Sequence, residues 1–153
     1  MSLALEKVIR PVFRRPAPSG TNDQRLNIAV IFTSVESTMA ALRRAGVLAS
    51  SLGGRIVLLA PQVVPYPLPL DSPPILIDWN ENRFRAIASA SPVETVVRLY
   101  LCRDKMETLK AALSPKSLVV IGGREKWWPF SSERTTARQL RRAGHEVIIT
   151  ETE

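Results

Sequence analysis

The feature that most constrains the fold is a regular alternation of short apolar stretches with longer amphipathic ones, which starts at Leu26. The apolar stretches are rich in β-branched residues, as in "LNIAVIF" and "SLVVIGG". Such stretches are typical of strands that are buried on both faces, and residues with helical spacing follow each of them. This alternation predicts a doubly wound α/β fold, in which right-handed crossovers join parallel strands and helices cover both faces of the sheet.

The pattern predicts five strands with helices between them. The strands are expected at residues 26–32, 55–60, 93–101, 117–123 and 145–150. The last helix should begin at Ser131 or Ser132, either of which can cap it, and should end at Gly144. Residues 61–77 carry six of the chain's 12 prolines, which disfavour both a regular helix and a central strand. We therefore expect a long crossover loop there.

The N-terminal residues have a different composition. The segment "RPVFRRPAPSGTNDQR" contains three prolines and a glycine, which is typical of a tail or linker. The preceding "SLALEKVI" is expected to be a frayed terminus or a short amphipathic helix that docks on a partner or an anionic membrane surface. The chain is thus divided into a basic, proline-containing tail, residues 1–25, and one α/β domain, residues 26–153.

Composition excludes several classes of function. One cysteine, Cys102, rules out an intramolecular disulfide and a cysteine-cluster metal site, and one histidine, His145, argues against zinc or a serine–histidine triad. The net charge is +7, but it is spread along the chain without a basic run that interleaves with aromatics, so nucleic acid is not expected as a partner. No apolar run approaches the roughly 20 residues of a membrane span, and no secretory leader is evident. We expect a cytoplasmic protein.

Two loops are candidates for a shared ligand site, because parallel sheets bind ligands beyond the carboxyl ends of their strands where the strand order reverses. They are "FTSVES" after the first strand and "GGREKWWPFSS" after the fourth. Two glycines there allow a sharp turn, and the N-terminus of the helix that follows offers N–H donors to a phosphate. The candidate binding residues are Thr33, Ser34, Ala60, Gly122, Gly123, Arg124, Ser131 and Ser132. No catalytic residue or metal ligand is assigned, because no carboxylate pair stands out and Ser34 lacks the context of a nucleophile elbow.

Residues 26–150 resemble the universal stress protein family. The resemblance rests on "IAVIFTSVESTMAALRRAGVLASSLGGRIVLLAP", "SPKSLVVIGGRE" and "ARQLRRAGHEVIIT". It implies a five-stranded sheet of order 3-2-1-4-5, of the adenine-nucleotide alpha-hydrolase-like type. It also implies a homodimer formed through the last strand, and the apolar "HEVIITETE" fits such a role.

The ATP-binding branch of that family has an Asp at the end of the first strand and a G-x-x-G-(x)9-G-[ST] stretch after the fourth. Here the Asp position is Thr33, the first glycine matches Gly122, and the second falls on Glu125. The closing pair has no counterpart, so three of the four elements are altered. A glutamate in this loop blocks the turn and adds negative charge beside an anion, which is unfavourable unless Lys126 or Arg124 offsets it.

The resemblance implies a non-catalytic, homodimeric module of the stress response in which ATP binding is weakened or lost and no cofactor is required. The alternative is a nucleotide switch that still holds ATP with Mg²⁺ in the cradle after the fourth strand; Gly122→Val or Ser132→Asp should then abolish binding. Trp127 and Trp128 could bind a protein partner. They could equally pack on the domain.

Overall fold

Five parallel strands form the centre of the computed structural model, which describes residues 4–9, 26–70, 77–91, 93–123 and 132–151. The strands are β2 (Asn27–Ile31), β3 (Arg55–Val63), β4 (Thr95–Cys102), β5 (Leu118–Gly123) and β6 (Glu146–Glu151). Their order across the sheet is β4-β3-β2-β5-β6. Counted among the parallel strands alone, this is 3-2-1-4-5, which confirms the predicted fold class.

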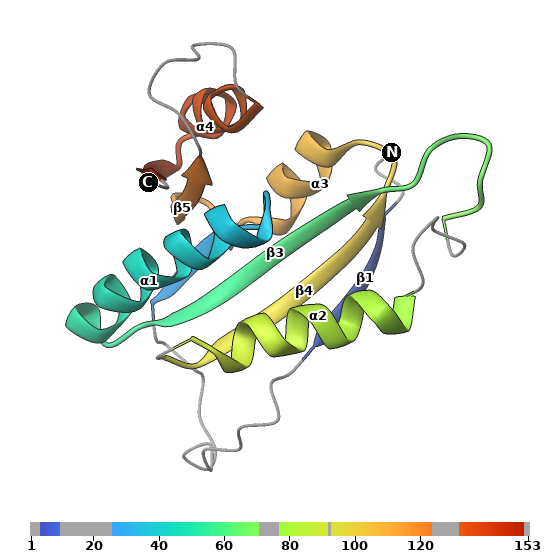
Figure 1. Ribbon diagram of the computed structural model, residues 1–153. Coiled ribbons are helices and arrows are strands. Elements are labelled where there is room, and N and C mark those ends of the chain that lie inside the picture. The colour runs from blue at the N-terminus through green and yellow to red at the C-terminus, as the bar shows by residue number, and fades with distance from the viewer. Residues whose placement is uncertain (1–3, 10–25, 71–76, 92, 124–131, 152–153) are drawn as a thin grey trace, which may run out of the picture.

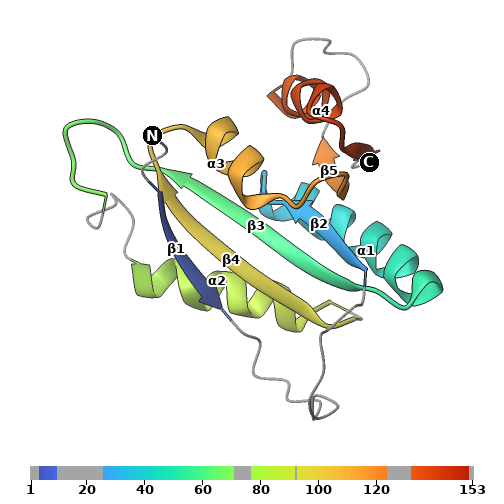
Figure 2. The ribbon, with the colours of Figure 1, turned by 180° about the vertical axis from the view of Figure 1, so that it is seen from behind.

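Within the described residues, four helices cover this sheet on both faces (Figures 1 and 2). They are α1 (Val35–Leu52), α2 (Ile77–Ser89), α3 (Lys105–Ala112) and α4 (Ser132–Arg142). α1 and α2 pack on one face, and α3 and α4 pack on the other. The ends of α1 follow from its sequence, since Ser34 caps the N-terminus and Gly53 ends the helix with a φ of 68°.

Each face of the sheet has its own apolar core, which explains why the central strands carry apolar residues on both faces. Along β2, Ile28 and Val30 belong to the core under α1 and α2, whereas Ala29 and Ile31 belong to the core under α3 and α4. Successive side chains of a strand point to opposite faces. The central residues of a strand between two helical layers are therefore apolar on both faces.

A sixth strand corrects the expectation for the N-terminus. β1 (Ala4–Ile9) is neither frayed nor helical: it pairs antiparallel with β4, in a register that joins Ala4 to Cys102 and Ile9 to Val97. Without it, β4 would be the edge of the sheet, with a row of unpaired N–H and C=O groups. Because β1 pairs with a strand far away in the sequence, its own residues give no local sign of the pairing. The helical spacing of these residues therefore led to a wrong prediction. Six residues of the predicted tail therefore belong to the sheet.

β3 is also longer than predicted and continues through Pro61 to Val63. The reason is that β2 ends at Ile31, which pairs with Leu59, so beyond this point β3 has a neighbouring strand only on the β4 side. The carbonyl of Leu59 faces the β2 side, where it accepts a hydrogen bond from the N–H of Phe32 (2.9 Å). Pro61, two residues on, faces the same side, so its missing N–H costs no ladder hydrogen bond.

Candidate functional site

The carboxyl ends of β2 and β5 lie side by side at the point where the strand order reverses. Ile31 pairs with Ile121 near the ends of these strands. The chain leaves β2 through Thr33 and Ser34, and Gly122 and Gly123 are the last two residues of β5. The structure thus brings these four predicted residues into one region.

Thr33 links the two strand ends directly. Its hydroxyl Oγ1 donates a hydrogen bond to the carbonyl oxygen of Gly122 (3.1 Å). Its backbone N–H donates to Oγ1 of Thr38, which is fully buried (3.1 Å). Both donors of Thr33 are therefore satisfied within the protein. Thr33, which occupies the Asp position of the ATP-binding signature, therefore links the loop after β2 to the end of β5.

Ser34 serves the helix that follows it. Its Oγ accepts a hydrogen bond from the backbone N–H of Ser37 (3.2 Å), which is the usual contact of a helix N-cap. Glu36 lies in the first turn of α1 and is exposed. A carboxylate there stabilises the N-terminus of the helix, but it repels a phosphate bound at the same helix end.

Gly122 is required by packing. A Cβ on Gly122 would lie 1.9 Å from the carbonyl oxygen of Ser37, so the first turn of α1 rests directly on the backbone of β5. A Cβ on Gly123 would meet its nearest neighbour, Cβ of Glu133, at 3.5 Å, which is ordinary contact. Only the first of the two glycines is therefore sterically necessary.

The sharp turn predicted at these glycines is not observed there. Both residues belong to β5, and neither is among the described glycines with positive φ, which are Gly53 and Gly144. The chain leaves the strand only after Gly123. The backbone freedom of glycine is thus not used for a turn at either position.

Of the remaining predicted residues, the structure describes Ala60 and Ser132. The side chain of Ala60 is buried in β3, with 2% of its surface exposed, and belongs to the core under α1 and α2. Ser132 is the first residue of α4. Arg124 and Ser131 lie outside the described residues, as do Trp127 and Trp128.

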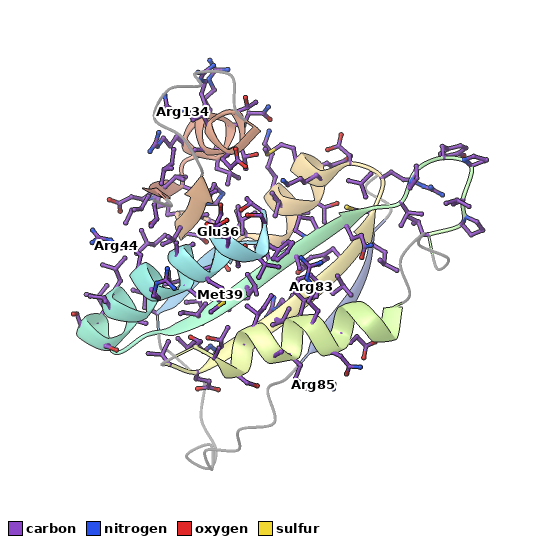
Figure 3. The ribbon with its side chains drawn as sticks, in the orientation of Figure 1. Glu36, Met39, Arg44, Arg83, Arg85 and Arg134 are labelled. Carbon is purple, nitrogen blue, oxygen red and sulfur yellow. The ribbon has the colours of Figure 1, made fainter. Side chains whose placement is uncertain are left out.

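A cluster that the sequence analysis missed lies just beyond β2, on the face of α1 and α2. The rings of Phe32 and Phe84 pack edge to face, with centroids 5.0 Å apart. The guanidinium carbon of Arg83 lies 5.1 Å from the centroid of Phe32 and 5.9 Å from that of Phe84. Figure 3 shows Arg83 and Met39 on the facing sides of α2 and α1, whereas Arg85 projects from the outer side of α2. Protein side chains therefore fill the space beside the end of β2.

The single histidine has a structural role. His145 is 8% exposed, and its Nδ1 accepts a hydrogen bond from the N–H of Ser117 (3.1 Å), which joins the start of β5 to the loop before β6. Among the described residues, no group of three or more His, Cys, Asp or Glu side chains is arranged to hold a metal ion. Within the same part of the chain, every helix is too short or too polar to cross a bilayer.

Cys102 is expected to be unreactive in the folded protein. It is fully buried, and burial raises the pKa of its thiol above the ordinary value of 9.0, although a hydrogen bond with Thr108 acts in the opposite direction. The thiolate is the reactive species, so a disulfide reagent at neutral pH should label the folded chain at least about 100-fold more slowly than the chain in denaturant. Rapid labelling of the native protein would contradict this buried environment.

The same shift gives the pH dependence of stability. Because the thiol ionises more readily in the unfolded chain, its contribution to stability is complete below pH 9.0 and is lost as the pH rises through the higher folded pKa. In a Cys102→Ala variant this alkaline loss should disappear.

Comparison with known proteins supports the fold. No protein-family model matches the sequence, and no curated protein is significantly similar to it. Among solved structures, the chain is similar to a protein of the universal stress protein family from Burkholderia pseudomallei, with a TM-score of 0.55 and 21% sequence identity. The match covers 84% of this chain and 98% of that one. The chain therefore has a fold of the universal stress protein type.

Proposed function

We propose that this chain is a non-catalytic regulatory module of universal stress protein type, which works as a homodimer in the stress response and in which ATP binding is weakened or lost. The observation that carries the proposal is the hydrogen bond from Thr33 to the carbonyl of Gly122. The resemblance places an adenosine-binding Asp at position 33. Here a neutral hydroxyl stands in its place and donates to the protein itself.

The surroundings of Thr33 support the same conclusion. The first turn of α1 lies against β5 so closely that Gly122 has no room for a Cβ. The exposed carboxylate of Glu36 places negative charge at the helix end beside this contact. Close backbone packing and a nearby like charge both disfavour a phosphate between the two strand ends.

A nucleotide-dependent thermal melt tests this proposal. A ligand that binds only the folded state stabilises it by about 2.7 kcal/mol at 100 times its Kd, which for a chain of this length raises Tm by about 5–10 °C. ATP and Mg²⁺ at about 2 mM would be 100 times the Kd of a site whose Kd is about 20 μM. We expect a shift of less than about 1 °C, and a shift of several degrees would favour the nucleotide switch instead.

The homodimer is proposed through β6. This strand lies at one end of the strand order of the described sheet, and Ile148 and Ile149 in its centre are only half-buried. An apolar strand at a sheet edge can pair with its counterpart in a second copy. Light scattering should therefore give twice the chain mass of 17.0 kDa, and a monomer at all concentrations would remove the dimer from the proposal.

A further inference from the structure

The edge of the sheet opposite β6 is formed by a strand that is remote from the domain in sequence. β1 lies outside β4, and residues 10–26 separate it from β2 (Figure 2). Its six residues pair with Val97–Cys102, which is all but the first two residues of β4. β1 is the one antiparallel strand of the described sheet.

The strand that β1 covers is strongly apolar. β4 reads "TVVRLYLC" and has a single charged residue, Arg98. Val97, Leu99 and Leu101 are all less than 7% exposed. A long apolar strand of this kind is an association hazard when it is left at an edge. β1, by contrast, has Glu6 and Lys7 at its centre, and charged residues on an edge strand discourage further pairing.

β1 is also attached differently from the other strands. β2, β3, β4 and β5 each have a strand on both sides, and β6 is joined by a short connection to α4, which packs beside it. In the described part of the chain, β1 has β4 as its only strand neighbour and also contacts α2, and residues 10–26 are its covalent link to β2. Pairing along a single edge is the weakest attachment that a strand can have in a sheet.

We propose that the outer edge of β4 is a strand-binding site whose partner is the N-terminal segment of a second copy of this chain. The chain's own Ala4–Ile9 occupies the site in the structure, and the same segment from another copy occupies it after exchange. Main-chain hydrogen bonds supply the affinity, and the alternation of side chains sets the register, as in other cases of strand addition. The site is separate from the loops at the carboxyl ends of β2 and β5.

At ordinary protein concentrations, the chain's own N-terminal segment binds the edge of β4 in preference to the segment of another copy. A tether of this length gives an effective concentration on the order of millimolar, so at micromolar protein a foreign segment competes poorly. Exchange therefore requires that the own strand be weakened. This predicts that a peptide will bind strongly only to a chain whose β1 cannot pair.

The test uses the full chain with Glu6→Pro and Lys7→Pro together, and a fluorescent peptide of residues 1–12. Alternate residues of an edge strand direct their N–H groups at the neighbour, so two consecutive prolines remove at least one ladder hydrogen bond whatever the register. The matched control is Glu6→Ala with Lys7→Ala, which removes the same side chains but keeps both N–H groups. We expect the peptide to bind the proline variant at least about tenfold more tightly than the wild-type chain or the alanine variant.

A folded proline variant that does not bind the peptide would overturn the proposal, and so would equal binding to all three chains. A peptide that carries the same two prolines should not bind any of them. If the proline variant does not fold, hydrogen exchange on the wild-type chain decides instead. Amides of β1 and of the outer edge of β4 should then exchange together, at least about tenfold faster than those of β2 and β5. Equal protection of all four strands would mean that β1 is not released and that the edge is not a binding site.

A cysteine cross-linking experiment distinguishes the exchange of β1 between chains from the dimer proposed through β6. Ala4→Cys places a second thiol opposite Cys102 in the register of β1 and β4. Oxidation during refolding from denaturant, when Cys102 is accessible, should link the two within one chain at low protein concentration and between chains at high concentration. Links only within a chain under both conditions would contradict exchange and would leave the β6 dimer untouched.

Discussion

Replacing Gly122 with alanine is expected to lower the free energy of unfolding by about 3 kcal/mol, near the upper end of the usual cost of overpacking. The new Cβ would lie 1.9 Å from the carbonyl oxygen of Ser37. The obstacle is backbone in the first turn of α1, so α1 or β5 must move as a whole. That movement also disturbs the hydrogen bond that Thr33 donates to Gly122. Urea denaturation followed by circular dichroism measures the change.

Gly123→Ala is the matched control, because it adds the same methyl group one residue later. Its nearest neighbour would be Cβ of Glu133 at 3.5 Å, and we expect a change below about 1 kcal/mol. Equal effects of the two substitutions would contradict the close packing of α1 on β5. The same geometry makes Gly122→Val unsuitable as a test of nucleotide binding, since the variant should lose stability whether or not a ligand binds.

Phe84→Ala is expected to destabilise the chain by about 3–5 kcal/mol, as is usual for a buried aromatic residue. The side chain is 4% exposed and packs edge to face on Phe32, beneath the guanidinium of Arg83. Together with Ile87 and Ala88 it joins α2 to the core. The substitution should therefore leave a cavity between α2 and the sheet, and thermal or urea unfolding should show the loss.

Asn82→Ala on the same helix is the control for Phe84. Asn82 is exposed and accepts a long hydrogen bond from Arg85 (3.4 Å), so its loss should change stability by less than about 0.5 kcal/mol. A loss below about 1 kcal/mol for Phe84→Ala would mean that α2 is not held by this residue. In that case the cluster beside the end of β2 would be looser than its geometry indicates.

The parts of the fold that sequence predicts are those with a local pattern. Each parallel strand is an apolar run, and Gly53 ends α1. The sequence therefore predicts these elements at nearly their observed positions. β1 was missed because its identity as a strand depends on β4, which lies far away in the sequence. The prolines from Pro61 onward predict a loop, whereas Pro61 lies in β3, because a proline fits a strand when its nitrogen faces a side without a neighbouring strand.

The site was predicted less completely for a related reason. The rule that parallel sheets bind ligands where the strand order reverses identifies the two strand ends, and the structure brings Thr33, Ser34, Gly122 and Gly123 together there. Sequence reasoning could not show that the hydroxyl of Thr33 donates to Gly122, or that Ser37 lies against that glycine. Such contacts depend on how a helix packs on a strand, and sequence spacing carries little information about that packing.

The most direct test of the proposed loss of ATP binding is a calorimetric titration of the full chain with ATP and with AMP, each with and without Mg²⁺. We expect no binding heat at protein concentrations of about 50 μM, at which a Kd of about 100 μM or tighter would be detected. The Thr33→Val variant, which cannot donate to Gly122, serves as a comparison and should also show no binding. Micromolar affinity of the wild-type chain for ATP would contradict the account, and it would mean that a phosphate is held beyond β5 despite the altered signature.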